Sequence, residues 1–167
     1  MVGFTAEMSG KSPEYVINFL RTLLGLMSEL VFSHNGSIDK FLGDGLMAVF
    51  GLPLTGSLDA TNAAKCALEI TKKVALWNAK NAEPTPTRIA IGIHYGEVIQ
   101  GDIGSDKRLE FTAIGDVVNL ASRIEDYCRT VDAAILVTDE FIQALLAEGS
   151  FELAASFNDE GEHPLRG

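Results

Sequence analysis

The spacing of apolar residues predicts two long amphipathic helices in the first half of the chain. Apolar side chains recur every three or four positions from Ser12 up to a stop at His34-Asn35-Gly36. The same period returns after Ser57 and fades by Asn81. This period is that of one face of an α-helix. Ser12 and Ser57 stand where an N-cap is expected, so each is predicted to begin its helix.

Shorter apolar runs predict strands. Residues 37–42 and 46–50 flank Gly43-Asp44-Gly45, and a short glycine-containing turn between apolar runs is typical of a β-hairpin. Residues 88–93, 97–101 and 134–137 are also predicted as strands. The polar segment 101–109, which contains Gly104, is predicted as a loop.

The second half of the chain completes an α+β pattern. Residues 117–130 are predicted as a helix, Thr138 as the cap of a shorter helix that ends at Ala147, and the segment after Phe151 as a strand. This order predicts a ferredoxin-like, split β-α-β-β-α-β fold, in which an antiparallel or mixed sheet is flanked by helices. One strand of that arrangement would precede Met1. We therefore expect residues 1–167 to be a single domain, trimmed at both ends from a longer protein; a naturally short chain is the alternative.

Composition and charge narrow the classes of partner. The 167 residues carry a net charge of -10, which argues against nucleic acid or an anionic membrane surface as the main partner. A triphosphate is compatible with this charge because metal ions and a few local cations can compensate for it. Cys66 and Cys128 are expected to be buried free thiols in a reducing compartment, the cytoplasm. We find no signal peptide and expect no segment apolar and long enough to span a bilayer.

Two segments carry candidate chemistry. The first, Lys40-Phe-Leu-Gly-Asp-Gly-Leu-Met-Ala-Val-Phe-Gly51, places the Asp44 carboxylate at a hairpin tip, where it could bind a divalent metal or simply form a turn. The second, Phe111-Thr-Ala-Ile-Gly-Asp-Val-Val-Asn-Leu-Ala-Ser-Arg123, places Asn119 and Arg123 one helical turn apart. That pair could bind a substrate or face solvent, and the residues alone do not decide between the two.

Both segments resemble the class III nucleotidyl cyclases, the family of adenylyl and guanylyl cyclases. The matching patterns are Lys-x-x-Gly-Asp-x-x-x-Ala-x-Phe-Gly and Gly-Asp-x-Val-Asn-x-Ala-x-Arg. The resemblance covers essentially the whole chain. It implies an adenylyl cyclase of the bacterial type, which converts ATP to 3′,5′-cyclic AMP and pyrophosphate with two Mg²⁺ or Mn²⁺ ions.

The resemblance also implies a role for individual residues. Asp44 would bind the metal ions, Asn119 would orient the ribose, and Arg123 would stabilise charge on the transferring phosphate. Lys40 and Thr112 would read the base: a Lys only donates hydrogen bonds, which suits N1 of adenine and not N1–H of guanine. Other substrate contacts would come from the backbone amides of Gly3, Phe4 and Thr5 and, by a short match, from Arg166.

The family pattern at the amino terminus is Asp-Ile-x-Gly-Phe-Thr, and Met1-Val-Gly-Phe-Thr5 matches all of it after the Asp. The first metal-binding aspartate would thus stand one position before Met1, and Glu7 does not replace it. We therefore expect residues 1–167 alone to fold but to be poorly active.

By the same resemblance the enzyme is a head-to-tail homodimer whose regulatory domain lies elsewhere in the parent chain. The alternatives are a guanylyl cyclase or a catalytically silent module that binds nucleotide or only dimerises. The Gly-Gly-Asp/Glu-Glu-Phe signature of diguanylate cyclases is absent. Two further polar residues are expected to be structural: Asp116, as a turn or cap residue, and His94, at a strand end.

Overall fold

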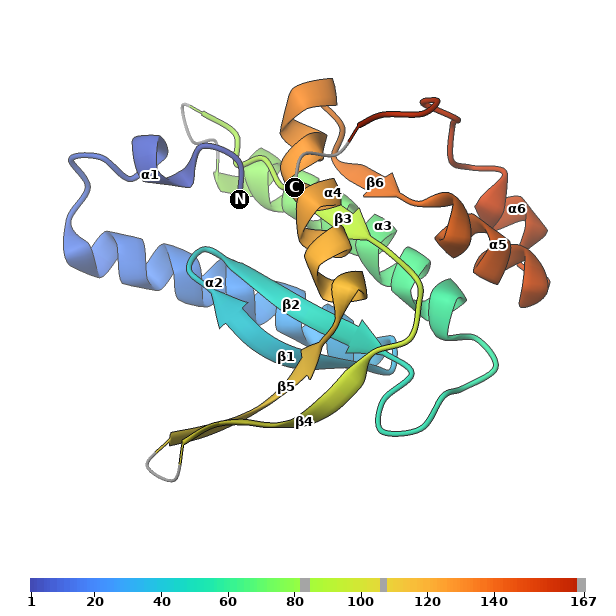
Figure 1. The fold of residues 1–167 in the computed structure, drawn as a ribbon. Helices are drawn as coiled ribbons and strands as arrows, with labels where there is room; N and C mark the ends of the chain where they lie inside the picture. Colours follow the sequence, from blue (N-terminus) through green and yellow to red (C-terminus); the bar gives the residue numbers. More distant parts are fainter. Residues whose placement is uncertain (82–84, 106–107, 165–167) are drawn as a thin grey trace.

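The computed structural model is an α+β fold, as the sequence predicts (Figure 1). It describes residues 1–81, 85–105 and 108–164. The described helices are α1 (Phe4–Glu7), α2 (Pro13–Ser33), α3 (Asp59–Asn81), α4 (Asp116–Val131), α5 (Asp139–Ala147) and α6 (Phe151–Ala154). The described strands are β1 (Gly36–Leu42), β2 (Gly45–Phe50), β3 (Ile91–Ile93), β4 (Ile99–Ser105), β5 (Arg108–Ile114) and β6 (Ile135–Val137).

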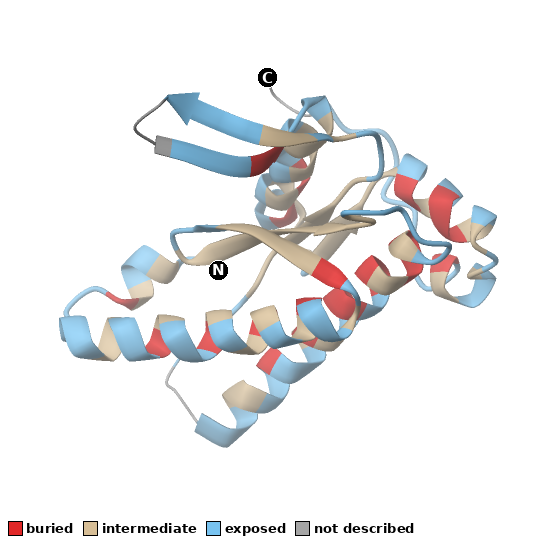
Figure 2. Cartoon of the chain, turned by 90° about the horizontal axis from the view of Figure 1, so that it is seen from below, coloured by how far each residue is buried: buried red, intermediate tan, exposed pale blue. Residues whose placement is uncertain are grey.

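The described strands pair in three two-stranded ladders, antiparallel β1–β2, parallel β3–β6 and antiparallel β4–β5. In the first, Leu42 pairs with Gly45 across the turn, and the register shifts between Ile38 and Lys40. Such a shift is a β-bulge, which leaves one residue, here Asp39, without a partner in the ladder. The β4–β5 ladder projects from the body of the molecule and is largely exposed (Figure 2).

Helices cover the strands on two sides. Helices α2 and α3 lie against one face, and α4 lies on the opposite side against β3 and β6 (Figures 1 and 2). Apolar side chains of α2 and α3, including Met27, Val31 and Ile70, pack with Ile38 and Ile91 from the strands. Burial of such side chains is the main favourable term in folding. The amphipathic pattern predicted for both helices is therefore confirmed.

A second core joins α3 to the carboxyl-terminal helices α5 and α6. It includes Ala60 and Ala64 of α3 together with Phe141 and Leu145 of α5. Beside it, the Glu148 carboxylate accepts hydrogen bonds from the backbone N–H groups of Ala60 and Thr61, at 2.9 and 2.7 Å, and from the Thr61 hydroxyl. These N–H groups belong to the first turn of α3 and have no partner inside the helix. Glu148 therefore caps a helix that begins almost ninety residues earlier in the sequence.

Gly92 sets how closely α4 approaches β3. A Cβ atom at Gly92 would lie 2.3 Å from the backbone N of Glu125 and 2.5 Å from the carbonyl oxygen of Ala121. Both atoms belong to the α4 backbone, which cannot yield as a flexible side chain can. The absence of a side chain at Gly92 is therefore what allows the helix to lie directly on the strand.

Several local predictions are confirmed. Ser12 is the N-cap of α2, and its hydroxyl accepts a hydrogen bond from the Tyr15 N–H. Thr138 is the N-cap of α5, and its hydroxyl accepts a hydrogen bond from the Phe141 N–H. The predicted hairpin around Gly43 and Asp44 forms, between strands β1 and β2. Side-chain caps and glycine turns are short-range signals, which explains why the sequence is sufficient to place them.

Other predictions are wrong. The segment predicted as a loop at 101–109 contributes to β4 and β5, which pair from Ile99 with Ile114 to Ser105 with Arg108. The segment after Phe151 is helix α6, not a strand. Ser57 is predicted to begin the second long helix, but helix α3 begins at Asp59. The turn before it is closed by the Asp59 carboxylate, which accepts a 2.6 Å hydrogen bond from the Gly56 N–H.

The prediction that no segment is apolar and long enough to span a bilayer is also wrong. Helix α2 meets that test by length and composition. In this structure its Phe19, Leu23, Met27 and Val31 are buried against the rest of the domain.

Cys66 and Cys128 are buried free thiols, as predicted. Burial raises the pKa of Cys66 to about 11 and raises the pKa of Cys128 as well. Because the thiolate is the reactive form, both cysteines are protonated and unreactive at neutral pH.

We expect Gly92→Ala to lower the free energy of unfolding by about 1–3 kcal/mol or more, because the new methyl group must displace the α4 backbone. Gly25→Ala is a matched control in the middle of α2, where nothing lies within 4 Å of the added Cβ. It should raise stability by about 0.5–1 kcal/mol, because alanine is the better helix former. Urea unfolding followed by circular dichroism measures the free energy of unfolding of both variants. If Gly92→Ala were as stable as the unmodified chain, the packing argument would be contradicted.

Candidate active site

The tip of the β1–β2 hairpin presents the Asp44 carboxylate. Gly43 has φ of +61°, and glycine at the first position of a two-residue turn is typical of tight hairpins. Asp44 follows it with a side chain 31% exposed, and its Oδ2 lies 2.7 Å from the backbone nitrogen of Met1. The hairpin tip and the start of the chain therefore meet. Any residue bonded to the Met1 nitrogen in a longer chain would lie beside this carboxylate.

The segment after Met1 is held by both its backbone and its apolar side chains. Val2 N–H donates to the carbonyl of Arg88 at 2.8 Å, and the Phe4 ring lies 6.2 Å from the ring of Phe19 on α2. Gly3, with φ of +74°, begins the single-turn helix α1. Among the described residues, the backbone N–H groups of Gly3, Phe4 and Thr5 have no hydrogen-bond partner. They are therefore available to bind an anion, as the resemblance implies.

Lys40 and Thr112 come from distant parts of the sequence and meet through Asp39. The Asp39 side chain is only 1% exposed. Its Oδ2 accepts a 2.7 Å hydrogen bond from the Thr112 hydroxyl, and its Oδ1 accepts a 2.7 Å bond from Ala113 N–H. The Lys40 Nζ lies 3.8 Å from the same Oδ2. The structure thus brings together the two residues predicted to read the base, on β1 and β5 of one chain.

Sequence reasoning missed two carboxylates at this junction. Glu110 lies two residues before Thr112 on β5, and its Oε1 forms a 3.0 Å ion pair with Lys40. Asp39 lies at the β1 bulge, which turns its side chain toward β5. An Asp-Lys pair in a strand is usually solvated, and a bulge has no local sequence signal, so neither role could be seen in the sequence.

Asn119 and Arg123 lie on the exposed side of α4. Both side chains are exposed, and within the described part of the chain neither has a hydrogen-bond or ion-pair partner. Since residues four apart in a helix lie on one face, the two side chains are available to the same ligand. The structure does not bring them into contact with Lys40, Thr112 or Asp44 of the same chain.

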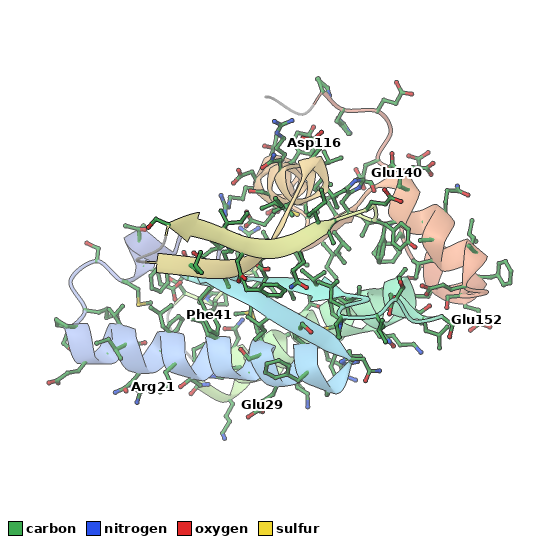
Figure 3. All side chains as sticks on the ribbon, turned by 60° about the horizontal axis from the view of Figure 1, so that its bottom comes forward. Arg21, Glu29, Phe41, Asp116, Glu140 and Glu152 are labelled. Atoms are coloured by element: carbon green, nitrogen blue, oxygen red, sulfur yellow. The ribbon has the colours of Figure 1, made fainter. Side chains whose placement is uncertain are left out.

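The start of α4 decides between the two structural roles predicted for Asp116, a turn residue or a helix cap. Gly115, with φ of +138°, is the N-cap, and no side chain caps the helix there. Asp116 is the first helical residue and its side chain is exposed at the helix start (Figure 3). Asp116 therefore does not cap α4 and directly follows the turn at Gly115. A carboxylate in the first turn still interacts favourably with the helix dipole.

His94 has a structural position, as predicted. Its Nδ1 lies 2.8 Å from the Thr138 hydroxyl and 3.8 Å from the Glu140 carboxylate. The imidazole thus connects the end of β3 to the start of α5. Hydrogen bonds from the backbone and from Thr138 lower the pKa of Glu140, with a smaller contribution from His94.

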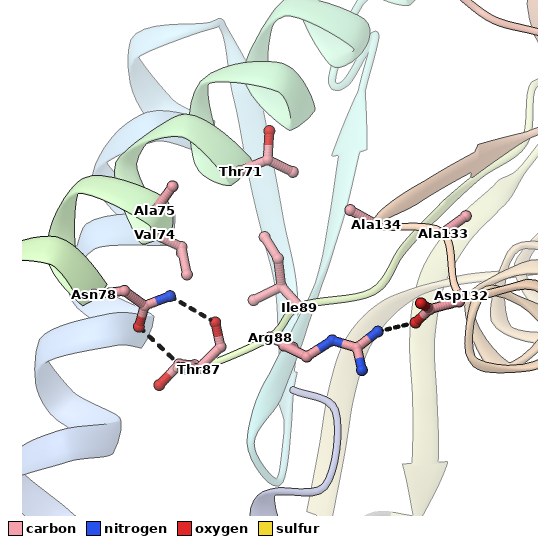
Figure 4. A pocket seen from close by; sticks show the side chains of 10 residues that line it. All are labelled: Thr71, Val74, Ala75, Asn78, Thr87, Arg88, Ile89, Asp132, Ala133 and Ala134. Carbon is pink, nitrogen blue, oxygen red and sulfur yellow. Dashed lines mark hydrogen bonds and ion pairs between the residues drawn. The ribbon is translucent and has the colours of Figure 1, made fainter. Parts of the chain in front are cut away.

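A hollow of about 290 Å³ lies elsewhere, between α3 and the segments at residues 87–89 and 132–134 (Figure 4). Asn78 exchanges two 2.9 Å hydrogen bonds with the Thr87 backbone there, and Arg88 pairs with Asp132. It contains none of the predicted site residues.

Arg166 lies outside the described residues. Within the described ranges no three His, Cys, Asp or Glu side chains cluster as a metal site. The candidate site therefore consists of two groups, one at Asp44 and the chain start, the other at Lys40 and Thr112, with Asn119 and Arg123 on a separate helix face.

The chain has recognisable relatives. Residues 1–167 match the family described as the adenylate and guanylate cyclase catalytic domain. Adenylate cyclase 1 of Rhizobium meliloti (strain 1021) is 36% identical over 137 residues, which cover 81% of this chain and 21% of the relative. The chain spans 7–30% of the length of three curated relatives that it matches.

Two solved structures share the fold. The guanylyl cyclase Cya2 has a TM-score of 0.77 and 34% identity, with 86% of this chain and 73% of that chain covered. The adenylyl cyclase CyaB from P. aeruginosa has a TM-score of 0.76 and 32% identity, with 87% and 76% covered. The family match extends over the full sequence and agrees with the fold, so this chain belongs to the family of adenylate and guanylate cyclase catalytic domains.

Proposed function

We propose that the chain is the catalytic domain of an adenylyl cyclase, which converts ATP to 3′,5′-cyclic AMP and pyrophosphate. The observation that carries this proposal is the junction of Lys40 and Thr112 through Asp39. Lys40 offers only hydrogen-bond donors, which suit the N1 acceptor of adenine. Guanine presents a donor at N1, which a Lys cannot accept.

A guanylyl cyclase is the second candidate, because the solved structure of Cya2 is that of a guanylyl cyclase. Lys40 favours adenine over guanine, because it can donate a hydrogen bond to N1 of adenine but cannot accept one from N1–H of guanine. A catalytically silent cyclase-like module is the third possibility. The side chains of Asp44, Asn119 and Arg123 are all present and not fully buried, which favours an enzyme over that module.

The remaining residues suit the ribose and the triphosphate. Asn119 can hydrogen-bond the ribose, while Arg123, fully charged at neutral pH, can stabilise the α-phosphate as negative charge develops on it. The amides of Gly3, Phe4 and Thr5 can bind the outer phosphate oxygens. The 3′-hydroxyl then attacks the α-phosphate in line and pyrophosphate leaves.

Two divalent ions, Mg²⁺ or Mn²⁺, are part of the proposal. The carboxylate of Asp44 is a hard oxygen ligand of the kind these ions prefer, and it is partly exposed at a turn where phosphate can approach. Bound ions would lower the pKa of the 3′-hydroxyl and neutralise the leaving group. Asp44 would share them with phosphate oxygens of the substrate.

We further propose that the enzyme is a head-to-tail homodimer. Large apolar side chains on β1 and on the β4–β5 ladder are exposed, namely Phe41, Leu42, Ile103, Leu109 and Phe111. Several large apolar side chains exposed on neighbouring strands favour an interaction site there. A second copy of the chain would cover it and would bring Asp44 of one protomer toward Lys40, Thr112, Asn119 and Arg123 of its partner, which creates two equivalent sites.

Because the chain spans 7–30% of the length of three curated relatives, we propose that regulation belongs to a domain elsewhere in the parent protein. We also propose a cytoplasmic location, where ATP is available and where the two free thiols would remain reduced.

Base selection is tested first. The full-length protein should form cyclic AMP from ATP in preference to cyclic GMP from GTP when Mg²⁺ or Mn²⁺ is present. Lys40→Glu combined with Thr112→Cys should lower the ATP-to-GTP ratio of kcat/KM by about tenfold or more, because an acceptor then faces N1. Lys80→Glu makes the same charge change on helix α3, away from the Lys40–Thr112 pair on β1 and β5, and should leave the ratio unchanged. A double variant with the original ratio would contradict the assignment.

Arg123→Ala should lower kcat far more than it raises KM. The charge that Arg123 stabilises develops during transfer, and removal of one such group typically costs about 2–3 kcal/mol of the barrier. Arg129→Ala is the matched control, because Arg129 lies on the same helix but pairs with Glu125 and Asp126. Equal effects on kcat and KM would instead assign Arg123 to substrate binding alone.

The shared site is tested by mixing two variants, Asp44→Asn and Arg123→Ala. Each alone should be nearly inactive, because both of its sites carry the change. A mixed dimer places both changes in one site and leaves the other intact, so an equal mixture should recover about a quarter of the original activity. No recovery in a mixture that exchanges subunits would rule out the shared site.

A further inference from the structure

The hydroxyl of Thr112 has two acceptors within reach, and the nearer one is Asp39. It donates to the Asp39 Oδ2 at 2.7 Å, whereas the Ala113 carbonyl oxygen lies 3.4 Å away. The other Asp39 oxygen is occupied by the Ala113 N–H at 2.7 Å. The buried carboxylate thus cannot turn away from Thr112 without leaving a backbone N–H unsatisfied.

A hydroxyl that donates to Asp39 keeps only its lone pairs for any other partner. Thr112 as a whole is 5% exposed. A base that reaches its hydroxyl oxygen can donate a hydrogen bond to it but can receive none while the proton stays on Asp39. The purine group that matches an acceptor at this position is a 6-amino group, which is a donor, whereas a 6-oxo group is an acceptor and would be repelled.

We propose that Asp39 is a specificity-determining residue of the site: it fixes the direction of the Thr112 hydroxyl and so selects purines with a 6-amino group. This inference rests on the proposed adenylyl cyclase function and deepens it. Asp39 need not touch the nucleotide; it is a positioning residue that acts through Thr112. The bulge in β1 is what makes this possible, because it directs the Asp39 side chain toward β5.

The test is Asp39→Asn in the full-length protein. With the Asn oxygen kept on the Ala113 N–H, the Asn amide would donate to Thr112. The Thr112 proton would then be directed to the base or to the Ala113 carbonyl oxygen at 3.4 Å. The probes are ATP and purine riboside triphosphate, which keeps the N1 acceptor for Lys40 but lacks the 6-amino group. We expect the ATP-to-purine-riboside-triphosphate ratio of kcat/KM to fall about 10- to 100-fold, mainly through loss of ATP use.

Two further variants separate this role from a purely structural one. Asp39→Glu restores an acceptor-only group and should recover much of the ratio. Glu148→Gln is the matched control: Glu148 also accepts from a threonine hydroxyl and backbone N–H groups, but at the start of α3. It should lower the melting temperature and leave the ratio unchanged.

The outcomes distinguish the two levels of the proposal. If the original protein makes no cyclic AMP or prefers GTP, the proposed function fails. If it prefers ATP and folded Asp39→Asn keeps the original ratio, only the role of Asp39 is overturned. Should Asp39→Asn not fold, Thr112→Ser must keep the ratio and Thr112→Val must lower it, and equal ratios for these two would overturn the inference.

Discussion

The close approach of helix α4 to strand β3 is the constraint on which the arrangement of the domain depends. The α4 backbone occupies the place where any side chain at position 92 would be. Because α4 is fixed in depth by this contact, the side chains on its outer face, Asn119 and Arg123, are held at a defined height above the strands. The opposite face of α4 is anchored by buried Ile124 and Cys128. The packing of α4 on Gly92 thereby fixes the position from which Asn119 and Arg123 can contact a ligand.

The elements that could be predicted from the sequence are those specified by nearby residues. Helix α2 is specified by its apolar period and by Ser12, and the β1–β2 hairpin by Gly43 at its turn. The β4–β5 ladder could not be predicted in full, because its outer half packs on nothing and so lacks the alternation that burial imposes. Helix α6 is four residues long, too short for any period to show.

The candidate site was predictable as a list of residues and not as an arrangement. The motif resemblance identifies Lys40, Thr112 and Asp44. It does not identify Asp39, the carboxylate that contacts both Lys40 and Thr112. Asp39 is adjacent to Lys40 in the sequence and would alternate with it in a regular strand. One extra residue in β1 changes that alternation, and the bond to Thr112 spans more than seventy residues. Long-range contacts of this kind follow from the tertiary fold and leave no trace in local pattern.

The carboxylate of Glu148 has a consequence for the order of events during synthesis. It satisfies the first turn of α3, yet it follows that turn by 87–88 residues. On a growing chain, α3 is complete long before its cap exists. The amino end of the helix must remain solvated, or fray, until α5 has been made and has docked. The contact between Glu148 and the first turn of α3 therefore forms late. Once formed, it couples α3 to the last third of the domain as a single cooperative unit.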